Sequence, residues 1–180
     1  EEISFNRRSN TCKWCAWDFK KKKNLRIIDV SKYKQNNKIK KKTFDNFFLI
    51  KDKDKIIFNK KSLKFVTKNK PTKNELKEIE FAFNVSKYVK SNAIVLTNNL
   101  STIGIGAGQP SRLDSCNIAI NKMIRFQNLR EEIVAASDAF FPFVDGIEKL
   151  VQSGVSAVIQ PAGSIRDKEI IKFANQTNTT

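Results

Sequence analysis

The chain has 180 residues with 40% hydrophobic content, enough for one compact domain, and its three cysteines are an odd number that argues against a disulfide framework. No apolar run reaches the roughly 18 residues of a membrane span, and the acidic start lacks a signal-peptide pattern, so we expect a soluble, cytoplasmic protein without membrane contact. Histidine is absent, which excludes the commonest general base near neutral pH from any chemistry of these residues.

The net charge of +16 is confined to the first half of the chain. Residues 1–90 hold 26 Lys and Arg against 10 Asp and Glu, whereas residues 91–180 hold 8 of each kind. The basic residues come as lysine runs mixed with asparagine, and Arg, which suits bidentate phosphate contacts better, is scarce there. We interpret these runs as a solvated face and disfavour nucleic acid as a partner. A basic nucleic-acid-binding module over residues 20–70 stays open as the alternative.

The first 24 residues form the least interpretable part of the chain. They show neither helical nor strand periodicity, so we expect an irregular segment over 1–24 and the main domain over 25–180. Cys12 and Cys15 have the C-x-x-C spacing of metal and redox sites. Since no second Cys pair or His completes four zinc ligands, no metal site is predicted.

Short strands are predicted between residues 25 and 67. The first lies at 25–28 and is followed by a polar loop at 34–42. The runs 44–50 and 55–58 predict two strands around a charged turn, and 63–67 predicts a third.

A helix is predicted to begin at Pro71-Thr72. Pro suits a first turn, Thr72 can cap it, and Glu75 and Glu78 lie near the positive end of the helix dipole. The apolar positions expected to form its buried stripe are Leu76, Ile79, Phe83 and Val85.

Strands and helices alternate regularly in the second half. The predicted strands lie at 93–96, 103–105, 133–136 and 155–159, with an Asn98-Asn99 turn after the first. The predicted helices span 111–124, a segment through Ile147 and Leu150 that Gly154 ends, and 167–174. This order indicates an α/β fold, a layered sheet with helices on both faces and some parallel strand pairs.

Three stretches of the second half carry a family resemblance. They are SNAI at 91–94 leading into TIGIGAGQPSR at 102–112, then ASDAFFPF at 136–143, and last VIQPAGSIRD at 158–167. In this order and at these spacings, the chain resembles the AICAR formyltransferase domain of bifunctional purine-biosynthesis enzymes, whose other domain is an IMP cyclohydrolase. The resemblance runs from about Lys20 to Ala174 and is expected to cover the C-terminal portion of the family's proteins only.

The resemblance implies both a fold and a reaction. The fold would be cytidine-deaminase-like, with 25–180 as a partial transferase domain. The reaction would move a formyl group from the co-substrate 10-formyltetrahydrofolate to the amine of AICAR during IMP biosynthesis. The implied partners are AICAR, folate, the remainder of the same enzyme and a second subunit in a homodimer.

Glycines 104, 106 and 108 have the spacing G-x-G-x-G, which does not match the dinucleotide-binding fingerprint. They let the backbone approach a ligand or a neighbouring strand closely, or else form a tight turn. A helix beginning near Ser111 would offer free N–H groups to an anion.

Arg112 and Asn92 each have an ordinary and a functional interpretation. Arg112, at a loop-to-helix junction, suits a carboxylate or phosphate partner, or only a surface ion pair. The resemblance implies that it lies in the folate pocket. Asn92 could simply cap a turn, whereas the resemblance implies a catalytic place beside the reacting formyl group, where its amide N–H would stabilise an oxyanion.

The aromatic run 140–143 is expected to place at least one Phe in the core. Aromatic faces also suit flat heterocycles. The resemblance implies that Phe140 lies against the nucleotide and that Phe143 and Asp145 contact the pterin, whose aminopyrimidinone edge can donate to a carboxylate.

The family's Lys-His catalytic pair cannot exist in a chain without His, and Val144 replaces the Arg usual at that position. We therefore expect the isolated chain to be inactive or nearly so. A decayed gene product is a further alternative, suggested by the unusual first 20 and last six residues.

Overall fold

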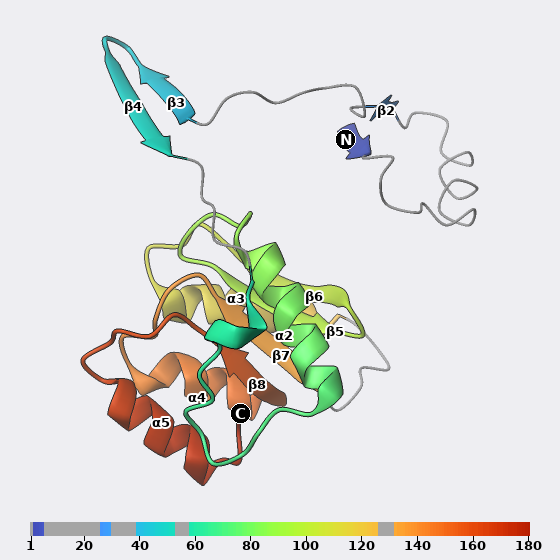
Figure 1. Ribbon diagram of the computed structural model, residues 1–180, viewed down its shortest axis with the longest axis vertical. Helices are drawn as coiled ribbons and strands as arrows, with labels where there is room; N and C mark the ends of the chain where they lie inside the picture. The colour runs from blue at the N-terminus through green and yellow to red at the C-terminus, as the bar shows by residue number, and fades with distance from the viewer. Residues whose placement is uncertain (1, 6–25, 30–38, 53–57, 126–131) are drawn as a thin grey trace. The chain divides into compact units, whose positions relative to one another are not determined.

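The computed structural model describes residues 2–5, 26–29, 39–52, 58–125 and 132–180 (Figure 1). The chain divides into two compact units between Lys55 and Ile56. In the described parts of the chain, no helix is long and apolar enough to cross a membrane.

Two small sheets make up the described part of the first unit. Strand β1 (Glu2–Phe5) pairs in parallel with β2 (Arg26–Asp29), so part of the segment expected to be irregular is a strand. Strand β3 (Ile39–Phe44) pairs antiparallel with β4 (Phe47–Asp52). Cys12 and Cys15 lie outside the described residues.

The hairpin β3–β4 corrects two predictions. The apolar run 44–50 is not one strand, because the chain reverses at Asp45, whose φ is 44°, and Asn46. Asp and Asn tolerate this left-handed conformation and therefore favour a turn. The surrounding phenylalanines make the run look like one apolar strand and so hide the turn. The polar loop predicted at 34–42 is also wrong in part, since β3 begins at Ile39.

Apolar side chains on both faces of this hairpin are exposed. Phe44 and Phe47 are cross-strand partners and so share one face, while Phe48, next to Phe47, lies on the other. Phe47 is 77% exposed and Phe48 is 70% exposed.

The second unit is built on a four-stranded sheet of order β6-β5-β7-β8. Its strands are β5 (Ile94–Asn98), β6 (Ser101–Gly106), β7 (Ile133–Ser137) and β8 (Val155–Ile159). Strand β5 is antiparallel to both neighbours, and within this four-stranded sheet only β7 and β8 run parallel. The predicted α/β class is confirmed, and the sheet is mixed, with one of its strand pairs parallel as the expected parallel pairing requires.

Helices cover both faces of this sheet, as predicted (Figure 1). On one face, α2 (Lys73–Ser86) packs Ile79 and Ala82 against Val134 and Ala136. The main core on the other face involves α3 (Arg112–Met123), α4 (Val144–Gln152) and α5 (Asp167–Gln176). The strand predicted at 63–67 is wrong, because the chain there is irregular after the short 3-10 helix η1 (Lys60–Ser62).

The start of α2 confirms the predicted cap. The Thr72 hydroxyl accepts from the Glu75 N–H at 3.0 Å, and the Glu75 carboxylate accepts from the Thr72 N–H at 2.8 Å. Glu78 is buried and accepts from the Leu100 N–H at 2.6 Å. This bond holds the β5–β6 turn, which lies at Asn99-Leu100, one residue after the predicted Asn98-Asn99.

Candidate ligand pocket and its arginine

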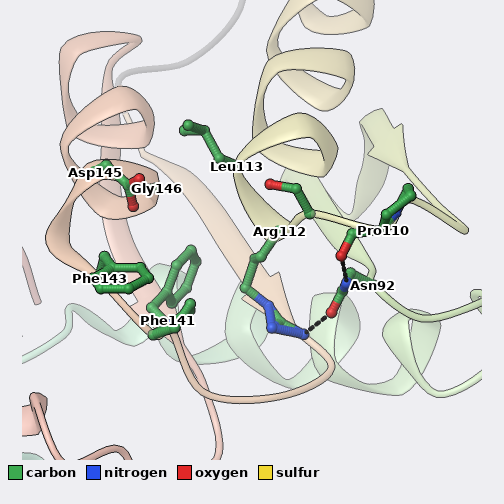
Figure 2. Close-up of a pocket in the computed structure, with 10 residues that line it drawn as sticks. Asn92, Pro110, Arg112, Leu113, Phe141, Phe143, Asp145 and Gly146 are labelled. Atoms are coloured by element: carbon green, nitrogen blue, oxygen red, sulfur yellow. Dashed lines mark hydrogen bonds between the residues drawn. The ribbon is translucent and has the colours of Figure 1, made fainter.

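A pocket of about 300 Å³ lies where the N-terminal ends of α3 and α4 approach each other (Figure 2). Asn92 and Arg112 lie on one side of it, and Phe141, Phe143 and Asp145 lie on the other. The remaining lining residues are Pro110, Ser111, Leu113, Pro142 and Gly146. Four of the five site residues predicted from the sequence therefore line one cavity.

Two glycines of β6 place α3 and hence Arg112. A Cβ atom at Gly104 would collide with the backbone carbonyl of Ala119, and one at Gly106 with that of Ser115. These glycines therefore allow close packing of α3 on β6. The close approach is to a helix of the same chain, which differs from the predicted approach to a ligand or a strand. Gly108 has a φ of +67° and forms the turn that follows.

Arg112 is 8% exposed and makes four hydrogen bonds. Its Nε donates to the Ser137 hydroxyl at 2.9 Å, and its Nη1 donates to the Phe140 carbonyl at 3.1 Å. Its Nη2 donates to Asn92 Oδ1 and to Asp138 Oδ1, both at 2.9 Å. The carboxylate expected to pair with Arg112 is thus the chain's own Asp138, and the ion pair joins a buried Arg112 to a partly buried Asp138.

A guanidinium group has five N–H donors, so among the described residues these bonds leave one Nη1 hydrogen for a ligand. The positive charge is already compensated by Asp138. Arg112 therefore offers the pocket one directed hydrogen-bond donor, while its positive charge is already balanced.

Asn92 is half-buried and fixes the loop that precedes α3. Its Nδ2 donates to the Gln109 carbonyl at 2.9 Å and to the Pro110 carbonyl at 3.0 Å, while its Oδ1 accepts from Arg112. Both amide hydrogens are engaged, so the oxyanion role expected of Asn92 requires one of them to change partner when a ligand binds.

Phe143 and Asp145 present their side chains to solvent at the pocket. Phe143 is 50% exposed, and the Arg166 guanidinium carbon lies 4.8 Å from the centre of its ring, so one face of the ring is already stacked. Asp145 is exposed, and its Oδ1 accepts from the Gly146 N–H at 2.7 Å. Phe140 is the predicted residue that does not line the pocket; only its carbonyl reaches Arg112.

Phe141 is the core member of the aromatic run, as expected for at least one of the three phenylalanines. It is 1% exposed, and its N–H donates to Gln160 Oε1 at 2.8 Å, which ties the run to the end of β8. Cys116 is buried beneath the pocket, close to Gly146. Burial raises the pKa of the Cys116 thiol to about 12, so the thiol is neutral near pH 7 and is a poor nucleophile.

The sequence prediction missed the residues that hold Arg112. Ser137 and Asp138 belong to a motif that the sequence singled out, but spacing alone does not show which acidic residue meets an arginine 26 positions away. Arg112 is buried beside strand ends. This environment can be recognised only once the order of the strands in the sheet is known. Within the described residues, no group of three His, Cys, Asp or Glu side chains could hold a metal ion.

Comparison with known proteins extends these observations. A family model described as AICARFT/IMPCHase bienzyme matches residues 15–122. Bifunctional purine biosynthesis protein PurH of Buchnera aphidicola subsp. Schizaphis graminum is 47% identical over 161 residues, covering 88% of this chain and 31% of that protein. The Bartonella bacilliformis protein of the same name is 47% identical over 74% of this chain and 26% of its own length. The Persephonella marina protein of the same name is 41% identical over 89% of this chain and 32% of its own length.

The chain thus spans about a third of the length of the curated relatives that it matches. The matches do not bear out the narrower prediction that it corresponds to their C-terminal portion. They favour the transferase family over the nucleic-acid-binding alternative, because the family match and the PurH relatives extend across both units. The chain belongs to the AICARFT/IMPCHase bienzyme family.

Proposed function

We propose that the pocket is part of a formyltransferase site, which transfers the formyl group of 10-formyltetrahydrofolate to the amine of AICAR in IMP biosynthesis. The relatives are named bifunctional purine biosynthesis proteins, which supports this assignment. The observation that carries it is the convergence of Asn92, Arg112, Phe143 and Asp145 on one cavity from distant parts of the sequence.

The two sides of the pocket suit different parts of the ligands. Phe143 and Asp145 combine an exposed aromatic face with a carboxylate, the pair that a pterin needs for stacking and for its donor edge. Arg112 and Asn92 lie on the other side, where a donor would meet the formyl oxygen. The exposed ring of Phe140 lies outside this lining and is proposed to contact AICAR.

The reaction needs two kinds of assistance. The AICAR amine is a weak nucleophile, so its proton must be removed while the oxyanion of the tetrahedral intermediate is stabilised. The remaining Nη1 hydrogen of Arg112 is proposed as one donor for the oxyanion, and an amide hydrogen of Asn92 becomes a second when it leaves its carbonyl partner. With no histidine in the 180 residues, the base is proposed to come from the remainder of the same enzyme, in a homodimer.

Residues 25–180 are proposed to be part of the transferase domain, with a cytidine-deaminase-like arrangement and a cytoplasmic location. The mixed sheet with helices on both faces supports this arrangement. On its own the chain is expected to show no formyl transfer.

Titration of the purified chain with a stable analogue of 10-formyltetrahydrofolate tests the proposal. We expect saturable binding, weakened about tenfold by Phe143→Ala because the stacking surface is lost. Tyr88→Ala is the matched control, since Tyr88 is an exposed aromatic residue that does not line the pocket. Absence of binding, or equal losses in both variants, would contradict the proposed pocket.

A further inference from the structure

We propose that Asp138, together with Ser137, is a positioning residue that sets how Arg112 meets the ligand. The ligand-binding part of this inference rests on the proposed function. Neither residue lines the pocket, so each acts through Arg112.

Asp138 joins three segments of the site. Its Oδ1 accepts from Arg112 Nη2 at 2.9 Å and from the Ala93 N–H at 2.8 Å, and its own N–H donates to the Ala93 carbonyl at 3.2 Å. It therefore links the end of β7, the residue before β5 and the first residue of α3. Any change at Asp138 is transmitted to both Arg112 and the loop that carries Asn92.

Ser137 fixes the plane of the guanidinium. Its hydroxyl donates to the Ala139 carbonyl at 2.6 Å, which directs the oxygen lone pairs toward Arg112 Nε at 2.9 Å. Ser137 is almost fully buried, so water does not compete for this bond. With Nε, Nη2 and one Nη1 hydrogen all engaged, rotation of the guanidinium is blocked.

This arrangement predicts the chemistry that Arg112 recognises. An arginine with a compensated charge and one remaining hydrogen is matched to a single neutral oxygen acceptor, such as a formyl or amide carbonyl. A phosphate or carboxylate is bound best by an arginine whose positive charge is not already compensated. Asp138 thereby makes the Arg112 side of the pocket selective for a single carbonyl-type oxygen over phosphate and carboxylate groups.

The test uses the full chain and two variants. D138N keeps an oxygen acceptor for Arg112 and Ala93 but removes the charge, whereas D138A removes both. The side-chain NMR signals of Arg112 report rotation of its guanidinium directly and need no ligand. We expect separate Nη signals in the wild type and averaged signals in D138A.

Binding supplies the second readout. We expect D138A to bind the 10-formyl folate analogue about tenfold more weakly than the wild type, since a fixed donor is lost. Inorganic phosphate should perturb the Arg112 signals in D138N and leave them unchanged in the wild type. A purely structural role would change the folded fraction without creating an anion site. Should D138A fail to fold, the phosphate measurement on D138N carries the test, and unchanged Arg112 signals in D138N at saturating phosphate overturn the inference.

The outcomes separate this inference from the proposed function. Averaged Nη signals in the wild type, phosphate binding to the wild type at Arg112, or unchanged analogue affinity in folded D138A would each overturn it. If the wild type binds no folate analogue but its Nη signals are separate and become averaged in D138A, the positioning role stands and the proposed function fails.

Discussion

Gly106→Ala tests whether close packing of α3 on β6 places the arginine of the pocket. The added methyl group would collide with the backbone carbonyl of Ser115, which no rotamer change can relieve. To restore van der Waals contact, helix and strand must separate by on the order of 1 Å. We expect overpacking of this kind to lower the free energy of unfolding by about 1–3 kcal/mol.

The same shift would reach the pocket. Ser115 donates to the Asn92 carbonyl at 2.8 Å, and Arg112 lies one helical turn before it. A displacement of about 1 Å at such a site can lower function by roughly 100-fold. The affinity for the folate analogue should therefore fall by more than the loss of folded protein explains.

Thermal unfolding followed by far-ultraviolet circular dichroism measures the first effect. With roughly 4 °C for each kcal/mol, the melting temperature of Gly106→Ala should fall by about 4–12 °C. Ser101→Ala is the control, because Ser101 is an exposed residue of the same strand and should change stability by less than about 0.5 kcal/mol. A melting temperature of Gly106→Ala equal to that of the control would refute the packing argument.

Further predictions concern three polar side chains. Arg112→Leu leaves the partly buried Asp138 without its cation and should lower the free energy of unfolding in urea by about 3 kcal/mol; a loss below about 1 kcal/mol would contradict the ion pair. Thr72→Ala removes the cap of α2 and should cost about 1 kcal/mol, seen as a lower urea midpoint; an unchanged midpoint would argue against the capping box. Since burial raises the pKa of Cys116 from 9.0 to about 12, the folded chain keeps a proton that the unfolded chain releases, and stability falls as the pH rises through that range. Cys116→Ala should therefore lose less stability than the wild type between about pH 8 and pH 10, and parallel curves would contradict this.

The strands and helices of the second unit were predictable because their signals are local. Thr72 and Glu75 predict the start of α2, and Gly154 lies just after the end of α4, as expected of a residue that stops a helix. The apolar run 155–159 coincides with β8. The error at 44–50 arose because apolar content hides a turn, at Asp45-Asn46 within a phenylalanine-rich run.

The pocket was predictable only in part, and for a physical reason. The resemblance identified Asn92, Arg112, Phe143 and Asp145, and the structure brings them to one cavity. The environment of each depends on contacts between segments far apart in the chain. That Asp138 compensates the charge of Arg112 follows from the antiparallel pairing of β5 with β7, which residue spacing does not reveal.

The exposed phenylalanines of the β3–β4 hairpin bear on how the chain behaves in solution. Among the residues that the structure describes, this ribbon pairs with no third strand, and two strands alone cannot bury either of their faces. Self-association in which the faces of two such ribbons pack together would remove Phe44, Phe47 and Phe48 from water. Preparations of the whole chain should accordingly aggregate at lower protein concentration than preparations limited to residues 56–180.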